Sequence, residues 1–256
     1  MLLRSQLGLV GNSIIMSVRV GAVLAAMLLG GAAQAASMHT SGSGRARVSA
    51  SALHGQASAE SLSEAQSGTV GTLLRWVSSS RDNDGLPFIV VDKLGARVFV
   101  FDADATLLGS APVLVGIGRG DDSAPGVGTK RMGKIPVEQR TTPAGRFIAR
   151  FGPAKGHPPV LWIDYGDAIS LHPVVTANKK ERRLQRIKSA DADDHRISFG
   201  CVNVPASFYA KIVKPQFKSK NSRGVVYVLP DTKALTDVFP GIVLQAPTVS
   251  AAANEN

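Results

Sequence analysis

Cysteine is nearly absent from this sequence, since Cys201 is the single one among 256 residues. A structural disulfide needs two thiols, so the fold cannot be cross-linked within the chain. Three roles remain for the thiol: an inert buried side chain, a bridge to another molecule, or a reactive nucleophile. The residues around it must decide between them.

Aromatic residues are also scarce, at 5 %. The net charge of the chain is +10, which favours an acidic partner. That partner could be nucleic acid, anionic lipid or an anionic polymer of the cell envelope. The densest basic cluster, residues 178–188, contains no aromatic side chain on which a base could stack. We therefore expect no nucleic-acid partner.

Long apolar runs are missing after residue 35, where none reaches the roughly 20 residues that cross a bilayer. At the N-terminus, Arg19 precedes the apolar run Val20 to Leu29, and Ala33-Gln34-Ala35 has a cleavage-site pattern. Residues 1–35 are thus predicted to be a secretory signal peptide, with Met16 as an alternative start. We expect export to the periplasm or cell envelope, without a transmembrane span once the signal is removed; an uncleaved anchor is the alternative.

The rest of the chain divides by composition into four parts. Residues 36–68 are rich in Ser, Ala and Gly and predict a flexible linker. Residues 69–86 hold a short amphipathic helix, with apolar residues at Val70, Leu73, Leu74 and Val77, and a connection. A β-rich domain is expected over residues 87–230, followed by a small, polar C-terminal tail over residues 231–256.

Short β-branched runs bounded by turn residues predict the strands of that domain. They are Phe88 to Val91, Arg97 to Phe101, Val113 to Ile117, Arg146 to Ala149, Val160 to Ile163, Ile169 to His172 and Val225 to Leu229. A long surface loop is expected from Gly118 to Gln139, and Pro205 starts a helix with Phe208, Tyr209, Ile212 and Val213 on its apolar face. The fold class is therefore mainly β with a few short helices.

Two motifs suggest ligand sites that their spacing does not support. Residues 116–120 are glycine-rich, but no helix pattern follows and neither nucleotide-binding fingerprint fits. The group Asp191, Asp193, Asp194 and His195 matches no strong metal motif and is interpreted as a solvated acidic turn. His157 is assigned to a loop, and His39 and His54 to the linker. No metal and no cofactor are expected.

The basic segment from Asn178 to Lys188 has two interpretations. Leu184 and Ile187 form a thin apolar stripe, which predicts a short helix. Its charges could simply be solvated, or they could form an electropositive rim that attracts carboxylates or an anionic envelope polymer.

The stretch from Ser198 to Asn203 favours the nucleophile among the three roles of the thiol. Gly200 directly precedes Cys201, which permits a sharp turn and brings backbone amides near a reacting carbonyl. A thiol has a pKa of about 8.5, so it needs a base to form the thiolate near neutral pH, and His172 is the best candidate.

Three motifs together resemble the L,D-transpeptidase catalytic domain (YkuD-type) family. They are Ile-x-Leu-His ending at His172, Ser-x-Gly-Cys-x-Asn over 198–203, and Thr142-Pro143-Ala144-Gly145-Arg146-Phe147. The resemblance spans residues 87–230 and implies a β-sandwich or barrel whose cysteine attacks peptidoglycan stem peptides. It implies Cys201 as nucleophile, His172 as base and the carbonyl of Pro173 as the group orienting the imidazole.

The same resemblance implies an oxyanion hole made by the amides of Phe199, Gly200 and Cys201, with Asn203 organising the turn that begins at Ser198. Two departures stand out: Phe199 occupies a position that is usually His, and His172 lies 29 positions before Cys201, a longer gap than usual. The basic segment accounts for the excess as an insertion. The expected activity is L,D-transpeptidation; an L,D-carboxypeptidase and a catalytically silent peptidoglycan-binding module are the alternatives.

Overall fold

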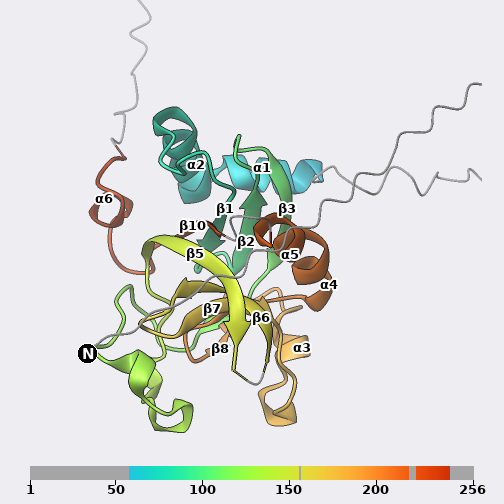
Figure 1. Cartoon of the computed structure of the whole chain (residues 1–256), viewed down its shortest axis with the longest axis vertical. Coiled ribbons are helices and arrows are strands. Elements are labelled where there is room, and N and C mark those ends of the chain that lie inside the picture. Colours follow the sequence, from blue (N-terminus) through green and yellow to red (C-terminus); the bar gives the residue numbers. More distant parts are fainter. Residues whose placement is uncertain (1–57, 156, 219–222, 243–256) are drawn as a thin grey trace, which may run out of the picture. The chain divides into compact units, whose positions relative to one another are not determined.

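The computed structural model describes residues 58–155, 157–218 and 223–242 (Figure 1). The predicted signal peptide, most of the predicted linker and the end of the C-terminal tail lie outside these residues. In the described ranges, no helix has both the length and the apolar character needed to cross a membrane.

An eight-stranded sheet organises the fold, with the strand order β3-β2-β1-β10-β5-β6-β7-β9. Two neighbouring pairs, β1 with β10 and β7 with β9, are parallel, and the others are antiparallel. The strands are β1 (Phe88–Asp92), β2 (Arg97–Phe101), β3 (Leu107–Pro112), β5 (Gly145–Ala154), β6 (His157–Asp164), β7 (Ile169–Pro173), β9 (Val202–Val204) and β10 (Arg223–Val228). The prediction of a mainly β fold is confirmed.

The two ends of the sheet approach each other at a short seam. Leu114, just beyond β3, and Asn203 of β9 exchange two backbone hydrogen bonds of 2.8 Å each. Nearby, β4 (Val115–Gly116) and β8 (Arg196–Ser198) pair in parallel as a separate two-stranded sheet. The sheet is therefore nearly closed, and the seam passes through a residue of the cysteine motif.

Strands β1, β2 and β10 are buried on both faces, which explains their continuous apolar runs. On one face lie α1 (Ala59–Gln66) and α2 (Gly68–Ser80) (Figure 1). Ala65 of α1 and Leu73 and Val77 of α2 share a core with Phe88, Phe99 and Tyr227. The opposite face forms a second core, to which β7 and β9 contribute. The core residues of these two strands are Ile169, Leu171, Val202 and Val204.

A helical segment after β9 covers part of this second core. It runs through α4 (Ala206–Phe208), a π-helical turn (Tyr209–Val213) and α5 (Lys214–Phe217). Tyr209, Val213 and Phe217 are buried in the core. The predicted helix after Pro205 and its apolar face are confirmed.

Three expectations for the first half of the domain were wrong. Helix α1 begins within the predicted flexible linker, capped by the side chain of Ser58. The predicted strand from Val113 to Ile117 is only the two-residue β4, while β3 lies just before it and has a weakly apolar sequence. His157 is the exposed first residue of β6 and does not lie in a loop.

The basic insertion and the tail also differ from expectation. The insertion is not one helix but a 3-10 turn (Lys179–Glu181) and α3 (Arg183–Arg186), separated by Arg182 with φ 50°. Ile187 is buried whereas Leu184 is exposed. The predicted tail contains α6 (Leu235–Val238) and buries Phe239 and Ile242 in the core under α2, where the Phe239 ring lies near Trp76 of α2 and Tyr227 of β10.

A buried ionic cluster joins the turn after β1, the long loop, the segment after β10 and strand β8. The ammonium of Lys93 lies 2.9 Å from Asp121 and donates to the carbonyls of Gly120 and Thr142 at 2.7 and 2.9 Å. Asp231 accepts from Arg196 at 2.7 and 3.1 Å, and Lys93 lies 3.6 Å away. Four charged side chains are thus paired with almost no exposure to water.

Replacing Lys93 by Met should destabilise the protein strongly, because Asp121 would remain buried without its cation. Breaking a buried ion pair from one side costs about 3–5 kcal/mol. We expect a loss of this size in the free energy of unfolding from urea titration. The exposed Lys211→Met is the control, with an expected change within about 0.5 kcal/mol; equal effects of both substitutions would contradict the prediction.

Asp121 should also make stability depend on pH. Burial alone would raise the pKa of Asp121, but hydrogen bonds from the amide of Asp231 and from Lys93 outweigh it and hold the pKa well below its usual range. The carboxylate therefore contributes stability above its unfolded pKa of about 3.9, and this contribution is lost as pH falls below that value. Urea titrations at about pH 7 and pH 3 should show a larger loss for wild type than for Asp121→Asn; parallel losses would refute this.

Candidate active site

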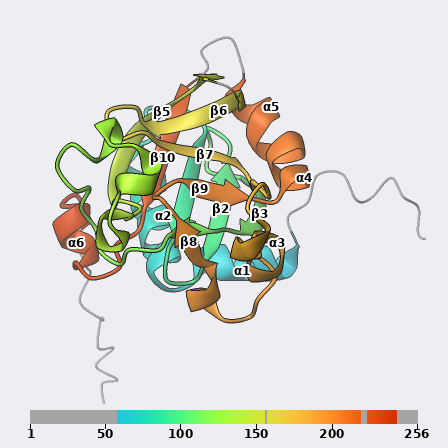
Figure 2. The same ribbon diagram turned by 90° about the horizontal axis from the view of Figure 1, so that it is seen from below.

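Cys201 lies in a tight turn between β8 and β9, two strands that are labelled in Figure 2. Gly200 has φ +122°, and a Cβ there would stand 2.7 Å from Ile169 Cδ1 and 2.8 Å from the carbonyl oxygen of Thr141. Any other residue would clash and strain the backbone. The glycine before the cysteine is therefore required by the packing of this turn.

Two hydroxyl groups hold the turn by hydrogen bonds to its backbone. Thr142 donates to the carbonyl of Gly200 at 2.7 Å and accepts from the amide of Gly116 at 2.8 Å. Ser198 donates to the carbonyl of Cys201 at 2.6 Å and accepts from the amide of Gly200 at 3.1 Å. Thr142, which begins the Thr-Pro motif, thus contacts the cysteine turn directly.

Parallel pairing of β7 with β9 assembles the side chains around the thiol. Leu171 pairs with Val202 and His172 with Asn203, and successive side chains of a strand alternate between its faces. Leu171 and Val202 enter the core, so Ser170, His172, Cys201 and Asn203 share the other face. Two strand motifs distant in the sequence meet here.

The thiol of Cys201 contacts groups from β7 and from the turn that precedes it. Its Sγ lies 3.7 Å from Ser170 Oγ and 3.6 Å from the carbonyl oxygen of Ala168. Cys201 is partly exposed, while Ser170 is buried. The cysteine is therefore partly open to solvent as a residue, and a hydroxyl group lies beside its sulfur.

His172 is held in a defined orientation by its own strand. Its Nδ1 lies 2.8 Å from the carbonyl oxygen of Pro173. A carbonyl only accepts hydrogen bonds, so Nδ1 carries a proton and Nε2 remains to exchange one. This is the contact that the family resemblance implied for Pro173.

His172 and Cys201 perturb each other as a base and its partner acid do. Burial lowers the pKa of His172, but interaction with Cys201 outweighs it and raises the pKa above its ordinary value. Burial raises the pKa of Cys201, and interactions with His172 and Ser170 outweigh it and lower the pKa. Both shifts favour a thiolate next to an imidazolium.

The predicted oxyanion donors differ in availability. The amide of Gly200 already donates to Ser198 Oγ. Within the described part of the chain, the amides of Phe199 and Cys201 have no hydrogen-bond partner. These two N–H groups are thus the ones that could receive a developing oxyanion.

Phe199 supports the arginine that directly follows the long loop, which contains 3-10 turns at Val127–Thr129, Met132–Lys134 and Val137–Gln139. The guanidinium carbon of Arg140 lies 4.2 Å from the centre of the Phe199 ring, and its Nε donates to the carbonyl of Ile135 at 2.9 Å. Cation–π contact of this kind holds the loop against the cysteine turn.

Asn203 connects the site to the basic insertion. Its side chain is fully buried, with Nδ2 3.3 Å from His172 Nε2 and 3.4 Å from the carbonyl oxygen of Cys201. Its Oδ1 accepts from Arg183 Nη1 at 2.6 Å. The sequence pointed to Asn203 but missed Arg183, Ser170 and the hydroxyl of Thr142. Alternation along β7 would have found Ser170, two residues before His172.

The acidic turn that was considered as a metal site is occupied by internal contacts. Asp191 caps the 3-10 turn Ala192–His195, Asp193 pairs with Arg119, and Asp194 accepts from Ser189. His195 is buried between the carbonyls of Val113 and Ser189. Among the described residues, no group of three or more His, Cys, Asp or Glu side chains is arranged to hold a metal ion.

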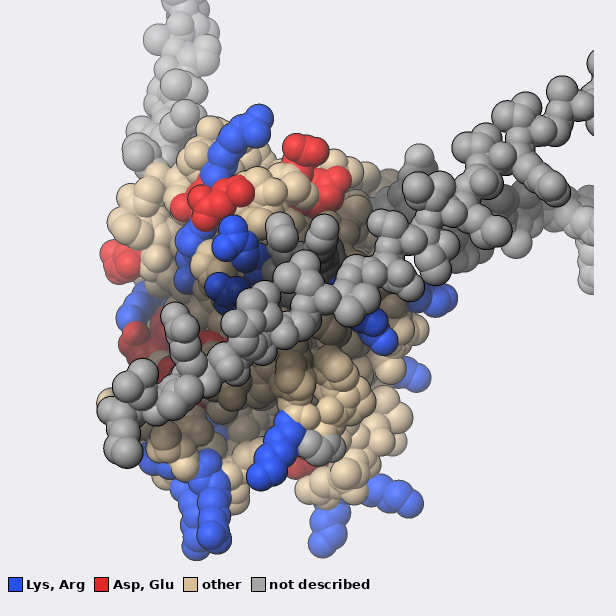
Figure 3. All heavy atoms as spheres, in the orientation of Figure 1, with Lys and Arg blue, Asp and Glu red and all other residues tan. Residues whose placement is uncertain are grey.

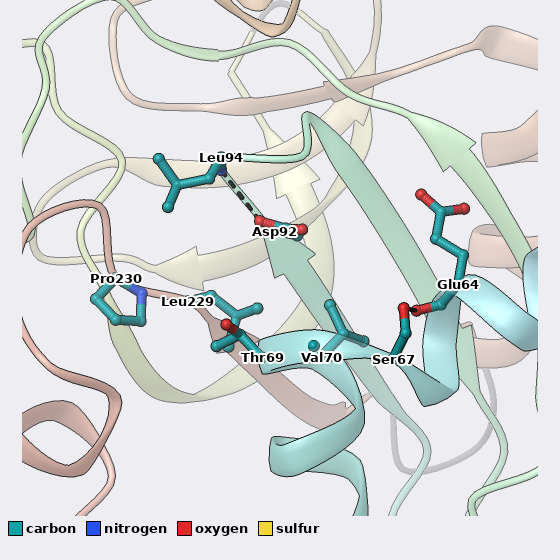
Figure 4. Close-up of a pocket in the computed structure, with 9 residues that line it drawn as sticks. Glu64, Ser67, Thr69, Val70, Asp92, Leu94, Leu229 and Pro230 are labelled. Atoms are coloured by element: carbon teal, nitrogen blue, oxygen red, sulfur yellow. Dashed lines mark hydrogen bonds between the residues drawn. The ribbon is translucent and has the colours of Figure 1, made fainter.

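A separate hollow of about 200 Å³ lies between the α1–α2 junction and the turn after β1 (Figure 4). Its polar groups are engaged locally: Asp92 accepts from the amides of Leu94 and Gly95, and Ser67 donates to the carbonyl of Glu64. The described residues that line it include neither histidine nor cysteine. The chemistry-bearing groups gather around Cys201 and not in this hollow.

Comparison with known proteins gives little beyond the fold. No family model and no curated protein matches the chain. The chain is similar to the NMR structure of the catalytic domain from E. faecium L,D-transpeptidase, at 18 % identity and a TM-score of 0.31, covering 56 % of this chain and 96 % of that one. A similarity at this score supports no conclusion about function, which has to come from the geometry of the site.

Replacing His172 by Gln should raise the pKa of Cys201, because the cation that favours the thiolate is removed. The rate of alkylation by iodoacetamide, followed against pH, should move to higher pH, toward the ordinary thiol with about 1 % thiolate at pH 6.5. Ser170→Ala should shift the profile in the same direction through loss of its hydroxyl. A His172→Gln profile that matches wild type would refute the pairing.

Proposed function

We propose that this protein is an exported cysteine acyltransferase that acts on peptidoglycan stem peptides as an L,D-transpeptidase. The observation that supports it is the convergence of Cys201, Ser170 and His172 on one face of the sheet, with His172 Nδ1 held by Pro173. The three sequence motifs that resemble the L,D-transpeptidase family meet at the same place, since Thr142 bonds to Gly200.

The first half-reaction forms a thioester. The thiolate of Cys201 attacks the carbonyl carbon after the third stem residue, and the amides of Phe199 and Cys201 stabilise the oxyanion. The new C–S bond forms, and the C–N bond to the terminal D-alanine breaks as the imidazolium of His172 gives its Nε2 proton to the departing amine. His172 is left neutral with a lone pair on Nε2.

The second half-reaction reverses the proton transfer. An amine from a neighbouring stem attacks the thioester and loses a proton to His172 Nε2, and the thiolate leaves. The new C–N bond is a crosslink, and the imidazolium–thiolate pair is restored. If water attacks in place of the amine, the product is a trimmed stem, which is carboxypeptidase chemistry at the same site.

Basic side chains flank the strands that carry the site. Lys130, Arg131 and Lys134 of the long loop and Lys179, Lys180 and Arg182 of the insertion are exposed. Figure 2 shows the loop and α3 on either side of β7 and β9, and Figure 3 shows Lys and Arg side chains projecting from this part of the molecule. We propose that they draw anionic envelope polymer toward the thiol.

Acylation by a carbapenem tests the proposal directly, because these β-lactams acylate the cysteine of the resembled family. Intact-mass measurement should show one covalent adduct on wild type, none on Cys201→Ala, and slower formation on His172→Gln. An adduct that persists in Cys201→Ala, or none on wild type, would overturn the proposed function. Products of digested peptidoglycan then separate crosslinked dimers from trimmed monomers, and sacculus binding without either product would indicate a silent binding module.

A further inference from the structure

The basic insertion reaches into the candidate active site through one side chain. Arg183, the first residue of α3, is only 10 % exposed, and its Nη1 lies 2.6 Å from Oδ1 of the fully buried Asn203. Glu181 holds Arg183 from the other side, with its Oε2 2.5 Å from Arg183 Nε. The basic residues that precede it in the insertion, Lys179, Lys180 and Arg182, are exposed. Arg183 therefore differs from them in both its burial and its hydrogen-bond partner.

The arginine fixes which way the Asn203 amide points. A guanidinium has five donors and no acceptor, so the atom of Asn203 that faces it must be the oxygen. The NH₂ group therefore faces His172, with Nδ2 3.3 Å from Nε2. The only other described contact that favours this orientation is the longer one between Nδ2 and the carbonyl oxygen of Cys201, at 3.4 Å, so removing Arg183 weakens the preference.

The orientation of the amide in turn decides the state of His172. An NH₂ group can only donate toward Nε2, which must then present a lone pair, while the carbonyl of Pro173 requires the proton on Nδ1. The two neighbours together select the neutral tautomer protonated on Nδ1. Its free Nε2 lone pair is the one that takes a proton from the thiol or from the acceptor amine.

We propose that Arg183 is a positioning residue of this site, which selects the His172 tautomer through Asn203 and favours release of the proton that Nε2 carries during the reaction. Cys201 and Arg183 are the charged or titratable groups that act on His172, and Glu181 partly neutralises Arg183. Cys201 favours the imidazolium and Arg183 opposes it. The imidazolium is thus kept acidic enough to protonate the departing amine of the proposed transpeptidation, on which this role rests.

The test observes His172 directly, by imidazole ¹⁵N–¹H correlation NMR of the full chain across pH, with His172→Gln to assign the signals. Wild type should show the Nδ1-protonated tautomer at the alkaline end. In Arg183→Met the tautomers should mix and the His172 titration midpoint should move to higher pH. Arg183→Lys keeps a charged donor and should restore part of the wild-type behaviour.

Lys180→Met is the matched control, because it removes the same charge from an exposed position of the insertion and should leave His172 as in wild type. Glu181→Gln provides an independent arm if Arg183→Met does not fold: it leaves Arg183 uncompensated and should move the His172 midpoint to lower pH. If Arg183→Met behaves like Lys180→Met, or if Glu181→Gln leaves the midpoint unchanged, the role is refuted.

Turnover gives a second readout that separates this role from the proposed function. With a peptidoglycan stem donor, Arg183→Met should lower kcat on the order of ten-fold with KM little changed. This loss is a part of the roughly 10²–10⁴-fold rate enhancement that a positioned acid–base group contributes. A changed tautomer without any turnover in wild type would keep Arg183 as the positioning residue and reject the transpeptidase. If wild type turns over but Arg183→Met leaves the His172 tautomer unchanged, the transpeptidase is supported and the positioning role of Arg183 is rejected.

Discussion

The arrangement of the loops around the cysteine turn depends on the hydrogen bonds of one buried ammonium group, that of Lys93. It binds the carbonyl of Thr142 while the hydroxyl of the same threonine binds Gly200, so one residue separates the ionic cluster from the cysteine turn. Arg196 of β8 joins the cluster from the other side through Asp231. Burying charges is costly unless each is paired and hydrogen-bonded, and the pairing here is nearly complete. Because the cluster holds Thr142, it also restricts the geometry of the cysteine turn that Thr142 binds.

Within that frame, the candidate site arises from strand pairing and not from local sequence. The parallel register of β7 and β9 aligns Ser170 and His172 with Cys201 and Asn203, while the residues between them enter the core. The same register gives each functional side chain a buried neighbour that fixes its strand. Hydrophobic packing on one face thereby determines the chemistry on the other.

The sequence predicted the β class, most strands of the domain and His172 as the partner of Cys201, and the family resemblance implied the contact between the imidazole and the carbonyl of Pro173. It failed where local composition and tertiary environment disagree. Strand β3 is weakly apolar yet is paired with β2, and the first residues after β10 look like a polar tail although Asp231 completes a buried cluster. Arg183 was counted among surface charges because nothing local distinguishes it from Arg182. Contacts between residues far apart in the sequence decide all three, and composition does not report them.

The seam between Leu114 and Asn203 has a consequence for when the thiol becomes reactive. These residues are distant in the chain, and contacts of high sequence separation are costly to form in folding because a long loop must be closed. Asn203 and His172 take their places only when β9 is paired on both sides. Before that, Cys201 is an ordinary thiol with a pKa of about 8.5. Nucleophilicity is therefore a property of the finished fold, and an incompletely folded chain carries a cysteine that is comparatively inert.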